Sequence, residues 1–496
     1  MTDAPPEQAE VVAFLRGLAS ADPIETHISL VFLGADTVWK LKKAVRLPFL
    51  DFSAVDDRRR FTEREFALNS PAAPELYRDV VPIVRGRDGG LTLGGDGPAV
   101  DWVLRMARVP ADDFLDAMAH AGRIDPPLLD RLADAVAAYH AGLPPLAGQL
   151  AALEPIARGN ARAALAAGLP VERVTPWETA MLAALAGLRD WRAARAADGF
   201  VRRAHGDLHL GNLCLWSGAP ILFDALEFNE AMATIDLGYD LAFLLMDLDR
   251  RIGRAAANRV FNRYIARTGD VGMLPGLPQF LSMRAMIRAH VEQKLGRSAV
   301  AEEYLTAALG YQRPQQPVVV AIGGLPGTGK STLGRMLAPL LGAAPGALML
   351  RSDEIRKRRF GVAPEQRLPP DAYTAAVSET VFATLAEHAR CAAAAGHAVI
   401  ADATFMSTEH RAMIEAAADR AGVAFQGFWL TAPLSVLEAR VAARRDDASD
   451  ATVDVVRRAA RANVAMAEGG RWIVLDATDG ARAGDLAKAA LAPHVA

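Results

Sequence analysis

Apolar residues from about position 317 onward form short runs that alternate with stretches of helical spacing. The runs predict five strands, at 318–323, 347–352, 398–401, 424–430 and 472–475. The stretches between them predict helices at 330–341, 372–395, 408–421, 434–445 and 453–466. Strands that alternate with helices indicate a parallel sheet with helices on both faces. This part of the chain is therefore predicted to be an α/β domain.

The first 312 residues follow a different order, in which strands come first and helices later. The predicted elements are a hairpin within 28–47 around Gly34-Ala35-Asp36, a helix at 55–67, a strand pair at 80–84 and 100–109, a strand at 220–224, and helices within 128–197 and 235–309. This order predicts a bilobal α+β domain with a small β-rich lobe and a larger helical lobe. The polar, Pro-containing segment 311–317 is the predicted linker, which places the two domains at 1–312 and 313–496.

Composition narrows the class of protein. A chain of 496 residues is too long for one ordinary core, and 51% hydrophobic with 23% charged residues suits packed domains. The net charge of −3 gives no general reason to expect nucleic acid or an anionic membrane as a partner. With two cysteines, Cys214 and Cys391, neither a disulfide framework nor a zinc site built on paired cysteines is expected. The acidic N-terminus is unlike a secretory signal and no apolar run reaches the roughly 18 residues of a membrane helix, so we expect a cytoplasmic location without membrane contact.

One glycine-rich motif carries the clearest chemistry. The run G-L-P-G-T-G-K-S at 324–331 meets the pattern G-x-x-x-x-G-K-[ST] in full, directly after a predicted strand and at the start of a predicted helix. Glycines let backbone N–H groups converge on ATP phosphates, Lys330 neutralises phosphate charge, and the Ser331 hydroxyl is placed to bind Mg²⁺. The expected nucleotide-binding residues are Gly324, Gly327, Thr328, Gly329, Lys330, Ser331 and Thr332.

Two acidic residues follow neighbouring strands of the same predicted sheet. Asp353 comes directly after the second strand, at the end where open α/β sheets bind ligands, and is a candidate base for an acceptor hydroxyl. The alternative for Asp353 is a helix N-cap, a role that fits Ser352 equally well. Asp402 ends the third strand and is the candidate for holding the Mg²⁺ shell or orienting the acceptor.

Basic residues are placed to meet phosphate. Arg440 and Arg444 are four residues apart on one helical face, and the charged segment 445–450 that follows is typical of a mobile lid with phosphate-clamping arginines. The alternative is a solvated helix face. The basic run at 356–359 is a candidate for receiving an acceptor that already carries phosphate or carboxylate, and a solvated basic helix is its alternative.

These C-terminal features resemble the P-loop kinases that include gluconate kinase, the zeta-toxin group and polynucleotide 5′-kinase. The resemblance rests on the glycine-rich motif, R-S-D-E-I-R at 351–356, V-I-A-D-A-T at 399–404 and the arginine pair. It implies catalytic roles for Lys330 and Asp353, with Asp353 as the base towards the acceptor hydroxyl.

A second set of motifs lies in the N-terminal part. H-G-D-L-H-L-G-N at 205–212 is followed, after one strand, by I-L-F-D ending at Asp224. Asp207 is placed to accept a hydroxyl proton, while Asn212 and Asp224 are candidate Mg²⁺ ligands. His205 and Asp240 are expected to brace the loop. The motifs resemble the catalytic and metal loops of aminoglycoside phosphotransferases and choline kinases, which are relatives of protein kinases.

A kinase of that kind also needs a strand lysine paired with a helix glutamate. Lys40 and Lys42 share one strand face, and Lys40 is preferred because the small apolar Val38 precedes it by two residues, as in the A-x-K arrangement of kinases. Glu65 is the expected partner, with Glu63 as the fallback. The segment 29–35, taken as the phosphate-covering loop, has a single glycine where protein kinases have three.

Taken whole, the chain resembles bacterial fusion proteins that join an aminoglycoside-phosphotransferase-like domain to a P-loop kinase-like ATPase. The resemblance implies two Mg·ATP sites, each transferring the γ-phosphoryl group to a hydroxyl of a small molecule such as a sugar, a polyol or an aminoglycoside. One alternative is a nucleic-acid 5′-hydroxyl kinase in the C-terminal domain. The other is a regulatory ATPase whose N-terminal domain is a pseudokinase. The sequence gives no indication of oligomeric state.

Overall fold

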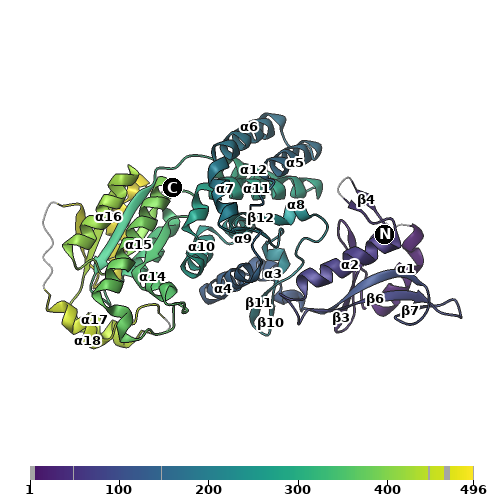
Figure 1. The fold of residues 1–496 in the computed structure, drawn as a ribbon, viewed down its shortest axis with the longest axis horizontal. Helices are drawn as coiled ribbons and strands as arrows, with labels where there is room; N and C mark the ends of the chain where they lie inside the picture. Colours follow the sequence, from purple (N-terminus) through teal and green to yellow (C-terminus); the bar gives the residue numbers. More distant parts are fainter. Residues whose placement is uncertain (1–5, 48–49, 147, 445–446, 463–469, 495–496) are drawn as a thin grey trace. The chain divides into compact units, whose positions relative to one another are not determined.

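A computed structural model of the chain describes residues 6–47, 50–146, 148–444, 447–462 and 470–494 (Figure 1). The chain forms two compact units. The first unit comprises Met1–Asp125, Ala138–Ala152 and Ala196–Asp240, and the second comprises Pro126–Ala137, Leu153–Arg195 and Leu241–Ala496. Packing therefore groups much of the predicted helical lobe with the C-terminal sheet. The division into domains at residue 312 stays a prediction.

The first unit contains a six-stranded antiparallel sheet in the order β1-β2-β3-β8-β6-β7. Its strands are β1 (Ile24–Glu25), β2 (Ser29–Leu33), β3 (Thr37–Lys42), β6 (Tyr77–Arg85), β7 (Leu91–Leu93) and β8 (Ala99–Ala107). The predicted hairpin is confirmed by the pairing of β2 with β3, and the predicted strand pair by that of β6 with β8. Helix α1 (Ala9–Leu18) packs Val11, Val12 and Leu15 into the apolar core on this sheet.

Helix α2 (Val55–Asn69) buries a polar face rather than an apolar one. Arg58, Thr62, Glu65 and Asn69 are all buried, and their spacing of three or four residues places them along one side of the helix. Buried polar groups are stable only when hydrogen-bonded. Arg58 accordingly pairs with Asp101, and Thr62 donates to the Arg58 carbonyl. Glu65 and Asn69 bind groups of the candidate site described below.

A short hairpin places the two N-terminal motifs together. Strands β10 (Leu213–Trp216) and β11 (Ala219–Leu222) pair antiparallel, with Leu213 opposite Leu222. The turn residues Ser217 and Gly218 both have positive φ, the backbone that a two-residue hairpin favours. The chain after Asn212 therefore returns to the same end of the hairpin just before Asp224. Remaining elements of this unit are η1 (Pro6–Gln8), β4 (Arg46–Leu47), β5 (Leu50–Asp51), η2 (Ala111–Asp113), α3 (Leu115–His120), β9 (Val201–Arg203), η3 (Leu210–Asn212), α8 (Glu230–Ala233) and β12 (Thr234–Asp236).

The second unit combines a helical region with a parallel sheet. The helices are α5 (Leu153–Ala166), α6 (Val171–Gly187), α10 (Arg254–Thr268), η4 (Val271–Gly276), α11 (Leu277–Lys294) and α12 (Ser298–Tyr311). Helices α4 (Pro126–Gly142), α7 (Arg189–Ala197) and α9 (Leu237–Arg251) have residues in both units. These bounds confirm the helices predicted within 128–197 and 235–309.

The sheet of the second unit confirms the predicted C-terminal strands. Five parallel strands lie in the order β14-β15-β13-β16-β17. They are β13 (Val318–Gly324), β14 (Leu348–Arg351), β15 (Val399–Asp402), β16 (Ala424–Thr431) and β17 (Trp472–Asp476). Every residue of the central strand β13 is buried, as expected for a strand covered on both faces. The register aligns Arg351 of β14 with Asp402 of β15, so the strand ends that carry the candidate acids lie together.

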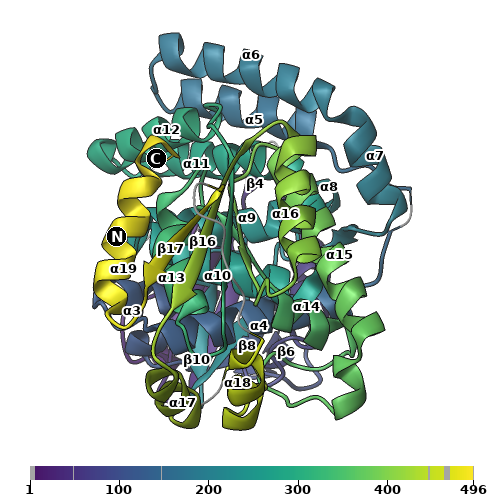
Figure 2. The ribbon, with the colours of Figure 1, turned by 90° about the vertical axis from the view of Figure 1, so that its left-hand side faces the viewer.

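Helices cover both faces of this sheet. Figure 2 shows α13 and α19 on one side and α15 and α16 on the other. The core beneath α13 and α19 contains Val318, Val320 and Ile322, which alternate along β13 and so point to one face. The helices are α13 (Lys330–Leu337), η5 (Ala338–Leu340), α14 (Ser352–Arg359), η6 (Pro370–Tyr373), α15 (Ala375–Ala394), α16 (Thr408–Ala421), α17 (Leu434–Ala442), α18 (Val453–Ala460), α19 (Gly480–Ala490) and η7 (Ala492–His494).

Several predicted bounds change. The helix expected at 330–341 ends at Leu337, because the chain tightens into a 3₁₀ turn that contains Pro339. The helices expected to reach 445 and 466 end at Ala442 and Ala460, and residues 445–446 and 463–466 lie outside the described residues. Helices α14 and α19 were not predicted, since neither shows a clear apolar period. None of the helices in the described ranges combines the length and apolar character that crossing a bilayer requires.

A buried histidine stands at the start of β15. The Nε2 of His397 donates to the Leu274 carbonyl at 3.0 Å. Burial lowers the pKa of this imidazole to about 4, so the ring is neutral in the folded protein near neutral pH. The unfolded chain takes up the proton at the usual pKa of about 6.5.

His397→Gln should therefore flatten the pH dependence of the unfolding free energy. The stabilisation from the neutral imidazole is fully present above about pH 6.5 and is lost as the pH falls towards 4, by roughly 3 kcal/mol. Glutamine keeps an Nε2–H donor but does not titrate. Urea unfolding at pH 7 and pH 4.5 should show a larger loss for the wild type than for the variant, and equal losses would contradict the assignment.

Candidate active sites

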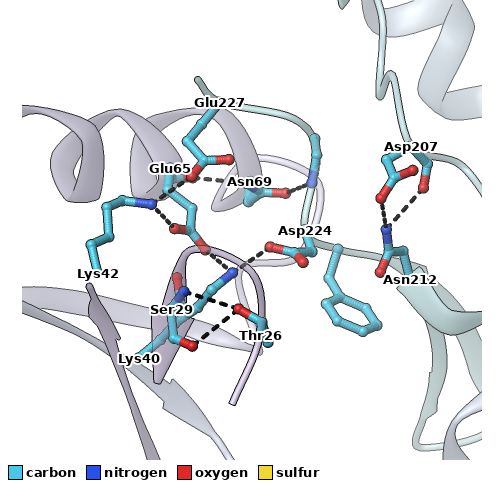
Figure 3. Close-up of polar contacts among 12 residues, drawn as sticks. Thr26, Ser29, Lys40, Lys42, Glu65, Asn69, Asp207, Asn212, Asp224 and Glu227 are labelled. Atoms are coloured by element: carbon cyan, nitrogen blue, oxygen red, sulfur yellow. Dashed lines mark hydrogen bonds and ion pairs between the residues drawn. The ribbon is translucent and has the colours of Figure 1, made fainter. Parts of the chain in front are cut away.

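The first candidate site is centred on Lys40 of β3. Its Nζ lies 2.7 Å from Oε1 of Glu65 on α2 and 2.5 Å from Oδ1 of Asp224 (Figure 3). The fallback partner Glu63 instead pairs with Arg59 on the exposed side of α2. Burial alone would lower the pKa of Lys40, but the carboxylates of Asp224 and Glu65 raise it well above its usual value. The predicted lysine–glutamate contact is therefore present, and Lys40 is held charged.

A second buried lysine joins the same cluster. The Nζ of Lys42 lies 2.8 Å from Oε2 of Glu65 and 2.5 Å from Oε1 of Glu227. Glu65 thus bridges both lysines, and although burial would raise its pKa, the two ammonium groups lower it to about 2. Burial raises the pKa of Glu227. Glu227 was not predicted; the only signal for it in the sequence is an acid three residues after Asp224.

The chain at Asp224 is held by α2 and β6. Asp224 has φ of 61°, and its N–H donates to the hydroxyl of Tyr77 at 3.0 Å. The next N–H, that of Ala225, donates to Oδ1 of Asn69 at 2.7 Å. Asn69 lies one helical turn after Glu65, so the same face of α2 fixes both the lysine cluster and the candidate metal loop.

The Asp207 loop is a compact unit beside this cluster. The Asn212 amide donates to the Asp207 carbonyl at 2.9 Å and to its Oδ2 at 3.0 Å. The Asp207 side chain is 41% exposed, so an acceptor hydroxyl has access to it. In Figure 3 the Asp207–Asn212 pair and the Asp224 cluster are two separate hydrogen-bonded sets within one close-up. The Phe223 N–H donates to the Asn212 carbonyl at 3.1 Å, so the Asp207 loop and the chain just before Asp224 are adjacent.

His205 and Asp240 hold this loop from behind. Asp240 accepts the backbone N–H groups of His205 and Gly206 at 3.0 and 2.9 Å, and the Nε2 of His140 lies 3.1 Å from it. The His205 ring donates through Nε2 to the Phe223 carbonyl at 2.9 Å, next to Asp224. Burial lowers the pKa of His205, which favours the neutral ring. These contacts fit the expected bracing role.

The predicted phosphate-covering loop is wrong. Ser29–Leu33 is strand β2, and Gly34 lies in the β2–β3 turn, where a Cβ would come within 2.7 Å of the Trp39 ring. The turn next to Lys40 in Figure 3 is instead the β1–β2 turn. Ser29 N–H donates to the Thr26 hydroxyl at 3.0 Å, which in turn donates to the Ser29 carbonyl at 3.1 Å. This turn contains no glycine.

The second candidate site is the glycine-rich loop between β13 and α13. Gly324, Gly327 and Gly329 have φ of 135°, 87° and 90°, a backbone that other residues rarely adopt. A Cβ at Gly324 would lie 2.5 Å from the Leu430 carbonyl oxygen. Lys330 folds back over the loop and donates to the carbonyls of Gly324 and Leu325 at 3.0 and 3.1 Å. Burial lowers the pKa of this ammonium, whose immediate partners are carbonyl dipoles.

Ser331 and Asp402 form the predicted metal-binding pair. The Ser331 hydroxyl donates to Oδ2 of Asp402 at 2.5 Å, at the end of β15. Thr328 donates to the Leu325 carbonyl at 2.8 Å, and Thr332 is exposed. The described residues contain no cluster of three or more histidines, cysteines and acids arranged for a metal. Mg²⁺ is nevertheless often bound by only one or two protein oxygens, with phosphate oxygens and water as its other ligands, and a hydroxyl with a carboxylate meets that need.

A cavity of about 1170 Å³ opens beside this loop. Asp353 lines it together with Lys330 and Asp402. Arg351, not Asp353, occupies the N-cap position of α14, so the cap alternative for Asp353 is wrong. Burial raises the pKa of Asp353, against the opposing effect of Arg351. A buried carboxyl with a raised pKa in a cavity is a candidate proton acceptor.

The two lid arginines have different surroundings. Arg440 donates to the carbonyls of Ala477 and Thr478 at 3.0 and 2.9 Å, so it ties α17 to the loop after β17. Arg444 also lines the cavity, and within the described residues its buried Nη1 has no hydrogen-bond partner. Of the two, Arg444 is the one with a donor left for phosphate. In the predicted lid segment, Asp447 pairs with Arg351 at 2.9 Å.

The basic run on α14 is not one surface. Arg356 lines the cavity and donates to the Ala372 carbonyl at 2.7 Å, while Lys357 pairs with Asp450 at 2.8 Å. Arg358 donates to the Ala266 carbonyl at 3.2 Å, and Arg359 is exposed. Only Arg356 among the four therefore faces the cavity with a guanidinium.

Comparisons with known proteins find two family matches in different parts of the chain. Residues 41–275 match the phosphotransferase enzyme family, and residues 319–478 match an AAA domain family. The uncharacterized protein Rv2004c of Mycobacterium tuberculosis (strain ATCC 25618 / H37Rv) is 28% identical over 455 residues, which cover 88% of each chain. The uncharacterized protein Mb2027c of Mycobacterium bovis matches to the same extent.

Similar solved structures include two proteins that are described as kinases. A gluconokinase from Sinorhizobium meliloti 1021 is 19% identical and covers 36% of this chain and 94% of its own, with a TM-score of 0.26. A choline/ethanolamine kinase family protein from Mesorhizobium loti is 12% identical and covers 62% and 99%, with a TM-score of 0.37. The chain thus joins a region that matches the phosphotransferase enzyme family to a region that matches an AAA domain family.

Proposed function

We propose that the protein is a phosphotransferase with two Mg·ATP sites, each of which transfers the γ-phosphoryl group to a hydroxyl of a small molecule. The observation that carries the proposal is a shared arrangement. Each site has a partly buried lysine, two side chains with oxygens of the kind that bind Mg²⁺, and a further carboxylate accessible to an acceptor. The oxygen-bearing pairs are Asn212 with Asp224 and Ser331 with Asp402. A cytoplasmic location, where Mg·ATP is abundant, is part of the proposal.

In the P-loop site the chain's own groups divide the chemistry. Lys330 and the backbone N–H groups of the loop bind the β- and γ-phosphates. Ser331 and Asp402 would hold Mg²⁺, which would neutralise charge on the transferring phosphoryl group. Asp353 accepts the proton of the acceptor hydroxyl as its oxygen attacks the γ-phosphorus, and ADP leaves. Arg444 also binds the phosphates, through the Nη1 that has no hydrogen-bond partner among the described residues.

In the N-terminal site Lys40, positioned by Glu65, binds the α- and β-phosphates. Asn212 and Asp224 would hold Mg²⁺, which would neutralise charge on the phosphates. In the structure Asp224 pairs with Lys40. Asp207 faces solvent and accepts the proton of the acceptor hydroxyl. His205 and Asp240 keep the loop in place without touching the substrates.

A small polyhydroxylated acceptor, such as a sugar, a polyol or an aminoglycoside, suits the P-loop cavity better than a nucleic acid. Recognition of a nucleic acid backbone needs a continuous basic surface. The run on α14 does not supply one, because Lys357 and Arg358 are bound to protein groups. Nucleic-acid 5′-hydroxyl phosphorylation remains the alternative for this domain.

One observation favours a second candidate, a regulatory ATPase with an N-terminal pseudokinase. The β1–β2 turn next to Lys40 contains no glycine, so its backbone N–H groups are less able to approach phosphates. Against this, the contacts of Lys40, Asp207, Asn212 and Asp224 are all in place.

The P-loop site is tested by Lys330→Ala in full-length protein that also carries Asp224→Ala to silence the N-terminal site. ATP turnover should fall by roughly 10²–10³-fold, because a preorganised positive charge at the transferring phosphate is lost. Lys488→Ala, an exposed lysine on α19, is the matched control and should leave turnover unchanged. Near-normal turnover in the Lys330 variant would exclude the P-loop as the working site.

Asp353→Asn should separate binding from transfer. The amide has the shape of the carboxylate but is no base, so Mg·ATP affinity should stay within about twofold while phosphoryl transfer slows roughly 10²–10⁴-fold. The measurement is calorimetric Mg·ATP binding alongside transfer to a panel of sugars and polyols. Unchanged transfer would show that Asp353 is not the base.

The N-terminal site is tested in full-length protein in which Lys330→Ala weakens the other site. Asp224→Ala should abolish the remaining Mg²⁺-dependent ATP binding, since it removes a charged metal ligand. Asp207→Ala should leave that binding intact but stop transfer, because a base facing the acceptor has little contact with the nucleotide. Mg·ATP binding is measured by calorimetry. If the folded Lys330→Ala parent binds no Mg·ATP, the pseudokinase alternative is supported. If Asp224→Ala and Asp207→Ala lose binding equally, the roles of metal ligand and base are misassigned.

A further inference from the structure

Strand β14 is the outermost strand at one side of the parallel sheet, so its outer edge pairs with no other strand of the described residues. Unpaired backbone groups on a buried strand are costly and need other partners. Helix α10 supplies them through one amide side chain. Asn262 accepts the Met349 N–H at 2.7 Å and donates to the Ala347 carbonyl at 3.2 Å.

A second asparagine supports the first. Asn258 lies one turn earlier on α10, is buried, and donates to the same Ala347 carbonyl at 3.0 Å. The Asn262 amide also donates to Oδ1 of Asn258 at 3.0 Å, which fixes the orientation of both side chains. The pair therefore binds β14 much as the peptide groups of a neighbouring strand would.

The helix that follows β14 is tied to the same partner. Arg358 of α14 donates to the carbonyls of Ile265 and Ala266 in the last turn of α10, where the helix dipole favours a cation. Arg263 of α10 forms a two-pronged contact with Glu365, just beyond α14. Figure 1 shows α10 beside α14. Helix α10 thus holds both ends of the β14–α14 segment.

That segment carries the candidate base. Asp353 is the second residue of α14, four residues after Met349. Helix α10 lies within the residues that match the phosphotransferase family, whereas β14 and α14 lie within the match to the P-loop family. An element of one family therefore supports the acceptor side of the other family's site.

We propose that Asn262 is a positioning residue of the P-loop site, through which helix α10 fixes the strand end that places Asp353 against the acceptor. The proposal rests on the proposed function of the P-loop site. Asn262 does not line the cavity beside the P-loop and touches no reacting group. Its effect is therefore on transfer and not on the binding of ATP, which the loop and Lys330 perform.

The test uses full-length protein with Asp224→Ala and compares three variants of the second unit. Asn262→Leu keeps the volume and removes the hydrogen bonds to Met349, Ala347 and Asn258. Asn262→Asp keeps the acceptor for the Met349 N–H and removes the donor. Ser282→Ala is the matched control, because it breaks a buried hydrogen bond between Trp177 and Ser282 in the same unit, away from the P-loop cavity. ATP turnover gives kcat and KM for ATP, and thermal unfolding gives Tm.

Asn262→Leu should lower kcat about tenfold or more with KM for ATP within about twofold, because small displacements of a catalytic group are costly. Asn262→Asp should have a kcat between those of the wild type and of Asn262→Leu. It tests the proposal if the leucine variant does not fold. Ser282→Ala should lower Tm but change neither constant. A folded Asn262 variant with wild-type kcat would overturn the positioning role of Asn262. So would losses of kcat that are proportional to the losses of Tm in all three variants. Either result would leave the proposed function of the P-loop site standing. Absence of Lys330-dependent turnover in the parent would overturn the proposed function and this inference together.

Discussion

Keeping a buried ammonium charged beside a phosphate site is the constraint on which both candidate sites depend. An unpaired charge cannot remain buried at acceptable cost. The N-terminal site meets the constraint with carboxylates, since Glu65 and Asp224 surround Lys40 and raise its pKa. The P-loop site meets it with carbonyl dipoles on Lys330, and burial lowers the pKa there. The first lysine is thus fully compensated by the protein, whereas the second gains most from the negative charge of a triphosphate.

This difference explains how the surrounding elements are built. In the first unit, carboxylates must come from several segments, so α2 buries a polar face that holds Lys40, Lys42 and the chain at Ala225. In the second unit the partners are local, because Lys330 bonds carbonyls five and six residues earlier in the same loop. Changes in distant segments should therefore disturb the first lysine more than the second.

Whether the partners of a residue are local or distant in the chain also decides whether its role can be predicted from the sequence. The P-loop, Ser331 and Asp402 follow from a short motif and from the rule that parallel strands end at one edge, and the structure brings them together as expected. The Lys40–Glu65 contact follows from a helix after a strand lysine. Glu227 has only its closeness to Asp224 as a signal and Asn262 has none, since their partners lie 185 and 87 residues away. The covering loop was misplaced because β1 has two residues, both exposed, and leaves no pattern.

Consecutive charges illustrate a more general limit. Four basic residues in a row suggest a phosphate-binding face when they are read as a string, but successive residues of an α-helix point about 100° apart. On α14 such a run must therefore point in different directions. Arg356 reaches the cavity, Lys357 meets Asp450, and Arg358 meets the end of α10. A basic run on a helix thus indicates charge near a site but not a surface, whereas residues three or four apart, such as Glu65 and Asn69, do define one.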